Sequence, residues 1–240
     1  MKTTSRSLAF LIGLTLFVST ASAHYLWVKL LHKEGRHGTT NLYFEGGPGP
    51  GTGEHLDPFI ERGKTWLRTP ENPKGKLLEM EVGKKPKSRW LTKGLGEGAP
   101  RSIDSYGKWG VYPYGKTDVL LHYHARLLDV ATAAELKQLA RAEQLELDIV
   151  PKATEAGMQL TVLWRGKPVA GRTVIIRGPK GFKADPKTDK SGTVSFKPTA
   201  AGTYLFRTSV DEKASGTFGG KEYQLKRYHA TMSFDLPLEE

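Results

Sequence analysis

The segment "RGKPVAGRTVIIRGP" (165–179), followed by "TDKSGTVSFKPTAAGTYLF" (188–206), decides the fold class. In both stretches, short runs of β-branched and aromatic residues are bounded by Gly, Pro or Asp, which is typical of strands separated by turns. Gly192 and Gly202 each stand directly before such a run, where we expect a positive φ that glycine adopts without strain. These stretches therefore predict consecutive short strands rather than helices.

The same rhythm continues through the whole C-terminal part. Seven short strand-like segments in about 90 residues predict an immunoglobulin-like β-sandwich over residues 145–240. The segments are "QLELDIV" (144–150), "MQLTVLW" (158–164), "GRTVIIRGP" (171–179), "GFKADPKTD" (181–189), "GTVSFKP" (192–198), "GTYLFRTSV" (202–210) and "EYQLKRYHATMSFDL" (222–236).

The preceding part, residues 24–130, is also rich in strand signals and is predicted to form a β-rich N-terminal domain. Within it, "EGGPGPGTGEH" (45–55) has too many glycines and prolines for regular structure, so we expect a loop there. The predicted strands of this part are 25–31, 40–45, 64–69, 76–82, 102–106 and 117–128.

A single helix is predicted between the two parts, over 132–144 within a connecting segment 131–144. Thr132 and Glu135 have the spacing of a capping box, in which the hydroxyl and the carboxylate each accept a hydrogen bond from a free backbone amide. Leu136 and Leu139 lie on one helical face. The predicted fold class is therefore all-β, with one short connecting helix.

Residues 1–23 have the organisation of a secretory signal peptide. Lys2 and Arg6 precede an apolar run over 8–18, and the segment ends in Ala21-Ser22-Ala23. The apolar run is short for a membrane span, although an uncleaved anchor is the alternative interpretation. We therefore expect a periplasmic or secreted protein whose mature chain begins at His24 and has no transmembrane segment.

Composition narrows the possible functions. The chain has no cysteine, so a metal would be held by nitrogen and oxygen ligands. Removal of the signal peptide lowers the net charge from +11 to +9. An exported location argues against nucleic acid as the partner of this positive charge. The densest basic stretch, 74–89, is interpreted as a solvated face, with anionic lipid or acidic polysaccharide as alternative partners.

His24 is the first candidate metal ligand. Cleavage would give it a free α-amine, and the amine and the imidazole Nδ1 could bind one metal ion as a chelate. One imidazole from elsewhere would complete a three-nitrogen set suited to Cu(II) or Ni(II). The alternative is that His24 is merely the residue that follows the cleavage site.

His122 and His124 are the second candidates. They are two residues apart in a predicted strand, so both side chains should lie on one face and could reach a common ion. Tyr123 and its apolar neighbours would occupy the other face. A half-exposed polar face without a metal, or histidines that bond to neighbouring strands, accounts for the pattern equally well.

Two further histidines complete the set of candidate ligands. The alternation in "KRYHATMSFDL" (226–236) predicts that His229 lies opposite a core-facing row, where a purely structural role is the alternative. His55 ends the Gly/Pro loop, where Glu54 could orient it as an outer carboxylate. His32 and His37 flank a turn and are expected to be solvated. No motif for nucleophilic, zinc-protease, P-loop or dinucleotide chemistry is present, so no catalytic residue is assigned.

Four further stretches are informative when taken together: "AHYLWV" (23–28), "DVLLHYHARLL" (118–128), "GKPVAG" (166–171) and "TDKSGTVSF" (188–196). They resemble an exported family of unknown function that is grouped with periplasmic components of nickel/cobalt uptake systems. The last two also look like the β-sandwich modules of carboxypeptidase-regulatory type. The resemblance implies that His24 presents a metal ion, which would then pass to a separate membrane transporter.

These observations lead to one hypothesis and two alternatives. The hypothesis is an exported protein that binds Ni, Co or Cu for delivery or sequestration, with His24, His55, His122, His124 and His229 as candidate ligands. The first alternative is a non-enzymatic binding module for a surface polymer or a partner protein, which an exposed aromatic row with no histidine cluster would indicate. The second is a copper oxygenase with a histidine brace, which would need two histidines converging on the His24 amine.

Overall fold

The computed structural model describes residues 24–239, and it confirms the all-β prediction; the predicted signal peptide lies outside the described residues. The N-terminal part contains β1 (Tyr25–Leu31), β2 (Thr39–Glu45), α1 (Asp57–Arg62), β3 (Lys64–Arg68), β4 (Lys76–Leu78), β5 (Glu81–Lys85), β6 (Ser88–Gly94), β7 (Arg101–Tyr114), β8 (Thr117–Asp129) and α2 (Ala133–Leu139). The C-terminal part contains β9 (Leu147–Thr154), β10 (Gly157–Trp164), β11 (Lys167–Pro168), β12 (Ile175–Arg177), the 3-10 turn η1 (Pro179–Gly181), β13 (Lys183–Ala184), β14 (Thr193–Phe196), β15 (Gly202–Glu212), β16 (Gly216–Phe218), β17 (Lys221–Tyr223) and β18 (Leu225–Leu236).

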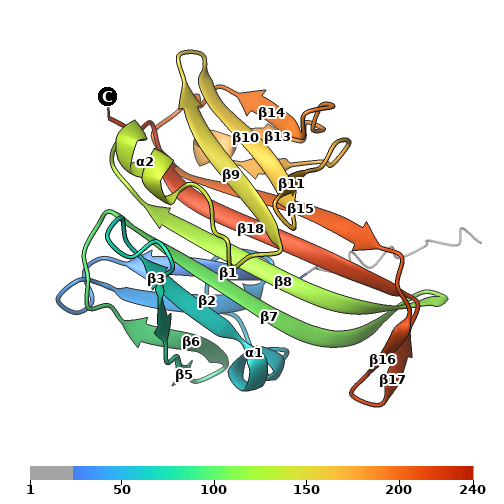
Figure 1. Cartoon of the computed structure of the whole chain (residues 1–240). Helices are drawn as coiled ribbons and strands as arrows, with labels where there is room; N and C mark the ends of the chain where they lie inside the picture. Colours follow the sequence, from blue (N-terminus) through green and yellow to red (C-terminus); the bar gives the residue numbers. More distant parts are fainter. Residues whose placement is uncertain (1–23, 240) are drawn as a thin grey trace, which may run out of the picture.

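One large sheet runs through both parts of the chain in the order β13-β12-β15-β18-β8-β7-β3-β4 (Figure 1). Its strand pairs are antiparallel except for β18 and β8, which are parallel. Two smaller sheets have the orders β1-β2-β6-β5 and β11-β10-β14, with β9 also pairing with β10, and β16 and β17 form a separate hairpin. The long strands β7, β8 and β18 thus form the middle of the molecule.

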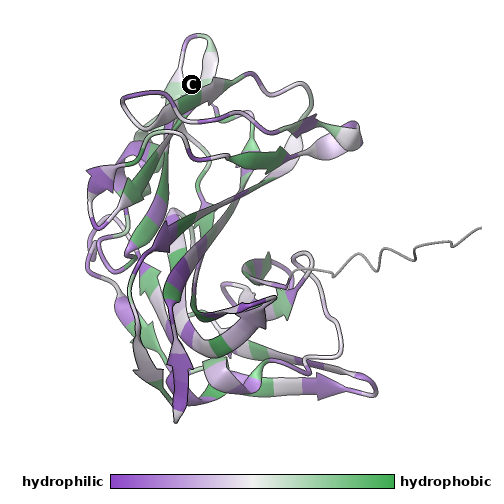
Figure 2. Ribbon diagram, turned by 90° about the vertical axis from the view of Figure 1, so that its right-hand side faces the viewer, coloured by the Kyte–Doolittle hydropathy of each residue, from purple (hydrophilic) through white to green (hydrophobic). Residues whose placement is uncertain are grey.

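The two smaller sheets pack against opposite faces of the large sheet, so there are two hydrophobic cores. In one core, the alternating row of β18 that includes Tyr228 and Phe234 packs with Tyr204 and Phe206 against β9, β10 and β14. The other core lies between β1 and β2 and the apolar face of β8. In the side view of Figure 2, apolar segments accordingly run through both the upper and the lower part of the molecule.

The predicted division into 24–130 and 145–240 would separate two strands that are paired in the large sheet. β8 belongs to the first part and β18 to the second, yet they pair over nine consecutive positions, from Val119–Leu225 to Leu127–Ser233. The core that contains Tyr228 and Phe234 also includes residues from outside 145–240, namely Leu128, Leu136 and Leu139. The two parts therefore share one sheet.

The connecting helix is shorter than predicted. The capping box is present, with Thr132 Oγ1 accepting from the Glu135 amide and the Glu135 carboxylate accepting from the Thr132 amide. The helix ends at Leu139 instead of continuing to Gln144. Arg68 and Arg126 donate hydrogen bonds to the last carbonyls, so two residues distant in sequence satisfy the helix C-terminus.

Five other elements, α1 and β4 to β7, differ from the sequence prediction. The six-residue helix α1, with a proline in its first turn, was not expected because it is too short to show a helical period. The predicted strand 76–82 is divided into β4 and β5, and β6 was not predicted. β7 continues to Tyr114, well beyond the predicted 102–106, despite the glycines and the proline in its second half.

Beneath the end of α2 lies a buried network of ion pairs. The Asp104 carboxylate pairs with Arg68 and, at 2.9 Å, with Arg126 Nε, and Arg126 Nη1 lies 3.0 Å from Asp148. Burial would raise the pKa of Asp104, but the two guanidinium groups outweigh it and hold the pKa below its usual range. The network joins β3, β7 and β8 to the start of β9.

Candidate metal-binding site

The large sheet separates the predicted histidines into two groups. His122 of β8 pairs with Tyr228 of β18, and the next pair is Tyr123 with His229. His122 stacks on Tyr228, with ring centroids 4.5 Å apart, and His229 stacks on Tyr123, at 5.0 Å. Since side chains alternate along a strand, His229 lies on the face opposite His122 and His124.

The face of His229 contains a cavity of about 700 Å³ that gathers residues from distant parts of the chain. It is lined by three of the predicted ligands, His24, His55 and His229. His24 directly precedes β1, His55 lies two residues before α1, and His229 lies in the middle of β18. We define this cavity as the histidine pocket.

His24 and His55 are in direct contact at one side of the histidine pocket. Their ring centroids are 5.4 Å apart and their planes are nearly perpendicular, at 85°. The Glu45 carboxylate at the end of β2 lies 3.7 Å from His24 Nε2. His55 and Glu45 therefore each contact His24, so three separate segments of the chain converge on this residue.

Backbone contacts hold this group in place. Glu45 Oε1 accepts a hydrogen bond from the Gly53 amide, at 3.1 Å, which ties the Gly/Pro loop to β2. A Cβ atom at Gly51 would lie 2.2 Å from the Glu45 carboxylate, so a larger residue there would displace it. Trp109 Nε1 donates to the His55 carbonyl at 3.1 Å. The loop that looked unstructured in the sequence is thus attached at both ends.

The predicted role of Glu54 is not reproduced. In the described part of the chain no hydrogen bond joins its carboxylate to His55, and its amide instead donates to Thr52 Oγ1. Glu45, beside His24, occupies the position of an outer carboxylate. The sequence gives no signal for this role, because Glu45 and His24 come together only when β1 and β2 pair.

His229 lies deeper in the histidine pocket than His24 and His55. Its ring is held between Tyr123 and Tyr25, the latter with ring centroids 5.3 Å apart, and its Nδ1 is buried without a hydrogen-bond partner in the described residues. Burial, assisted by the positive charge of Arg227, lowers the pKa of His229 to about 4. His229 is therefore neutral at pH 7.

His122 and His124 are packed away from the histidine pocket. Their Nδ1 atoms lie 3.0 Å from the Tyr106 hydroxyl and 3.1 Å from the His229 carbonyl, respectively. Burial lowers the pKa of His122 to about 4 and that of His124 to about 3. The two histidines share a face, as the sequence indicated, but that face is stacked between Tyr106 and Tyr228 and cannot join the group around His24.

Side chains alone do not form a complete metal site. Among residues 24–239, no group of three or more His, Cys, Asp or Glu side chains is arranged to hold a metal ion. His24 and His55 offer two imidazoles, and a free amine at His24 would be a third nitrogen.

A family described as a domain of unknown function, DUF4198, matches residues 21–212. The chain belongs to this family. The match begins beside His24 and covers the histidine pocket up to β15, but excludes β18 with His229. No curated protein matches the sequence. In the part described, no helix is long and apolar enough to cross a membrane.

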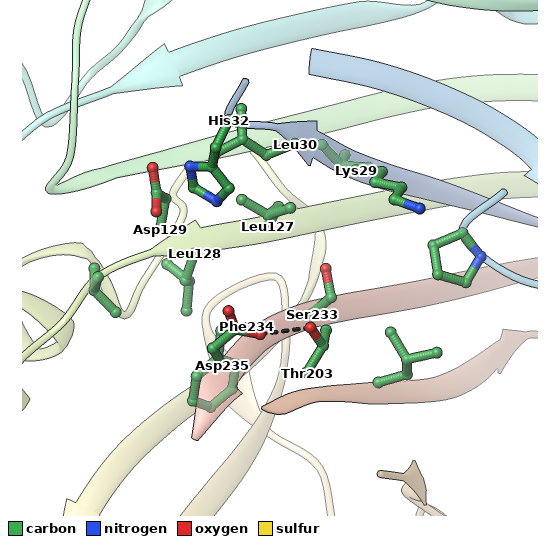
Figure 3. Close-up of a pocket in the computed structure, with 14 residues that line it drawn as sticks. Lys29, Leu30, His32, Leu127, Leu128, Asp129, Thr203, Ser233, Phe234 and Asp235 are labelled. Atoms are coloured by element: carbon green, nitrogen blue, oxygen red, sulfur yellow. Dashed lines mark hydrogen bonds between the residues drawn. The ribbon is translucent and has the colours of Figure 1, made fainter. Parts of the chain in front are cut away.

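A second hollow in this DUF4198 member, of about 390 Å³, lies beside β1 and the ends of β8 and β18. Figure 3 shows its lining, with Lys29, His32 and Asp129 from one side and the hydrogen-bonded pair Thr203 and Asp235 from the other. None of the five candidate histidines lines it. The histidine pocket is therefore the better candidate for a metal.

Aromatic residues of the histidine pocket were missed by the sequence analysis. Trp109, Tyr112 and Tyr114 line it together with Tyr25 and Phe44. Three of them lie in "WGVYPYG" (109–115), where the glycines and the proline conceal a continuous strand. The close spacing of aromatic residues between these breakers is the one signal that could have identified them.

Proposed function

We propose that this protein is exported, begins at His24 after cleavage, and binds a divalent transition metal for delivery or sequestration. The contact between His24 and His55 supports the proposal most strongly. The α-amine and Nδ1 of His24 would bind the metal as a chelate, and the His55 imidazole would supply the third nitrogen. This nitrogen set suits Cu(II), Ni(II) and, less strongly by intrinsic affinity, Co(II).

The surroundings of His24 fit this ligand set. Glu45 lies beside Nε2, which leaves Nδ1, the atom needed for the chelate, unopposed. In metal sites a carboxylate beside the outer ring nitrogen of a histidine fixes the ring and increases the basicity of the ligand. No hydrogen bond in the described part uses a ring nitrogen of His55, so that imidazole is also free to bind.

The resemblance to periplasmic nickel/cobalt uptake components supports a delivery role toward a separate membrane transporter. Nickel and cobalt are therefore candidates together with copper. His122 and His124 have no place in this proposal, because they lie on the other face of the sheet. His229 forms the floor of the histidine pocket and would contact a ligand or water beside the metal.

The test compares exported wild-type protein with a variant that carries one extra alanine before His24. The extension turns the amine into an amide but keeps the imidazole. In calorimetric titration with Ni(II) or Cu(II), it should weaken binding about as much as His24→Ala or His55→Ala, whereas His122→Ala is the matched control on the opposite face. Affinity should rise from pH 6 to 8, because the metal displaces the proton of an amine that titrates near pH 7.7–8.0 in model compounds. Equal affinity of the wild type and the extended protein would refute the proposal.

A copper oxygenase is the second candidate, because His55 converges on His24 as a histidine brace requires. The reaction products distinguish an oxygenase from a protein that only binds the metal. A copper-loaded oxygenase should oxidise a polysaccharide only when a reductant is supplied. Copper binding without such products would leave the delivery or sequestration role.

A further inference from the structure

The second half of β7 contains a β-bulge that changes which side chains face the histidine pocket. Lys108 pairs with His122, but the next pair is Gly110 with Leu121, so Trp109 is an extra residue in β7. Gly110 has a φ of 142°, in the range that favours glycine. A bulge reverses the alternation of the strand beyond it.

The bulge creates a continuous aromatic row. Before it, Gly107 pairs with Tyr123 on the pocket face, which places Trp109 on that face as well. After it, the even-numbered residues Tyr112 and Tyr114 take the pocket face. Without the bulge, Trp109 and the two tyrosines would lie on opposite faces of the sheet.

The row is accessible and narrow. Tyr112 and Tyr114 are 46% and 43% exposed, so both rings can be reached from solvent. Ring centroids are 6.1 Å apart from Trp109 to Tyr112 and 5.1 Å from Tyr112 to Tyr114, and each ring is turned by 63° or 64° relative to the next. A row only one ring wide offers too little area for a stable protein interface. It suits a narrow, twisted polymer chain in which each successive unit packs on one ring.

A positive charge beside the pocket indicates the chemistry of such a chain. The Arg207 guanidinium does not line the pocket, but it lies 4.7 Å from the centroid of the ring of Tyr25, which does. No acidic side chain among residues 24–239 forms an ion pair with Arg207. Arg227, by contrast, is neutralised by Asp211 through two hydrogen bonds of 2.6 and 2.8 Å. With a net charge of +9 after removal of the signal peptide, the protein also attracts anions at long range.

We propose that the histidine pocket and the aromatic row bind an acidic polysaccharide, one that carries carboxylates on its sugar rings. Trp109, Tyr112 and Tyr114 take the apolar faces of successive sugar rings, and Arg207 binds a carboxylate. The His24–His55 pair lies at the inner end of the row, where Trp109 contacts His55 with ring centroids 6.1 Å apart. This inference names the ligand class of the same pocket and rests on the proposed function for the exported location.

The experiment titrates metal-free protein, in the presence of a chelator, with an oligogalacturonate. We expect saturable binding that weakens as salt is added and that falls roughly tenfold in Tyr112→Ala and in Tyr114→Ala, as for a residue that dominates an interface. Leu77→Ala is the matched control, since Leu77 is 53% exposed on β4, outside the row. Arg207→Gln should weaken binding, whereas Lys180→Gln, which removes the same charge at η1, should not.

Two further probes complete the test. Equal binding of a neutral cello-oligosaccharide would overturn the acidic assignment, and binding of a proline-rich peptide but no oligosaccharide would overturn the polysaccharide altogether. Because the titration uses metal-free protein, its failure is distinct from the failure of Ni(II) or Cu(II) to bind. If Ni(II) and Cu(II) do not bind but the oligogalacturonate does, the proposed metal site is refuted and the proposed polysaccharide surface is retained.

Discussion

Replacement of Asp104 by asparagine should strongly destabilise the protein, because it removes a buried charge that two arginines share. Asp104 is fully buried and accepts hydrogen bonds from Ser102 Oγ, Arg68 Nε and Arg126 Nε. Asparagine keeps the shape but leaves two buried guanidinium groups with Asp148 as their one remaining acidic partner in the network. Breaking a buried ion pair typically costs about 3–5 kcal/mol.

The expected loss is large enough to measure in two ways. A domain of this size loses about 2–4 °C of melting temperature per kcal/mol, so the variant should melt about 6–20 °C lower. Urea unfolding should show the same loss through a lower midpoint at an unchanged slope. The matched control is Asp185→Asn, which removes an exposed aspartate that pairs with Arg177, and it should change little.

Unfolding at low pH checks independently whether the charge of Asp104 is the cause of the lost stability. Since the folded-state pKa of Asp104 is lowered, its ionisation stabilises the protein fully above the ordinary aspartate pKa and loses its effect as pH falls. The difference between wild type and Asp104→Asn should therefore be constant near neutral pH and shrink below about pH 3.9. A loss below about 1 kcal/mol at pH 7, or a loss that does not shrink in acid, would refute the assignment of this network as a buried ionic contact.

Three further predictions follow from the packing. Thr132→Ala removes the capping hydroxyl from Glu135 and should lower the free energy of unfolding by about 1 kcal/mol in urea, with Thr132→Ser close to wild type. Gly107→Ala places a Cβ atom 2.3 Å from the Phe59 ring, so it should lower the free energy of unfolding by about 1–3 kcal/mol in thermal unfolding. It should also weaken metal binding at the neighbouring His55. An unchanged melting temperature would mean that Phe59 moves freely. We expect the fragment 145–240 to unfold cooperatively. Because it exposes the edge of β18 that pairs with β8 in the full chain, it should also self-associate in size-exclusion chromatography. A strictly monomeric fragment would contradict this expectation.

The sequence by itself determined the fold class and most strand positions. Turn glycines such as Gly192 and Gly202, with φ of 75° and 132°, are visible in the sequence because their conformation is a local property. The capping box of α2 is local in the same sense. The alternation of β8 and β18 correctly assigned His122 and His229 to their strand faces, since the two-residue period of a strand needs no knowledge of its partner.

Only the tertiary structure decided which of the candidate ligands meet. The parallel pairing of β8 with β18 placed His229 and His122 on opposite faces, and the pairing of β1 with β2 brought Glu45 to His24. The end of α2 was set by Arg68 and Arg126, and the aromatic row by a bulge opposite β8. Each of these outcomes depends on strand register and on contacts between residues far apart in the chain, which local sequence patterns do not encode.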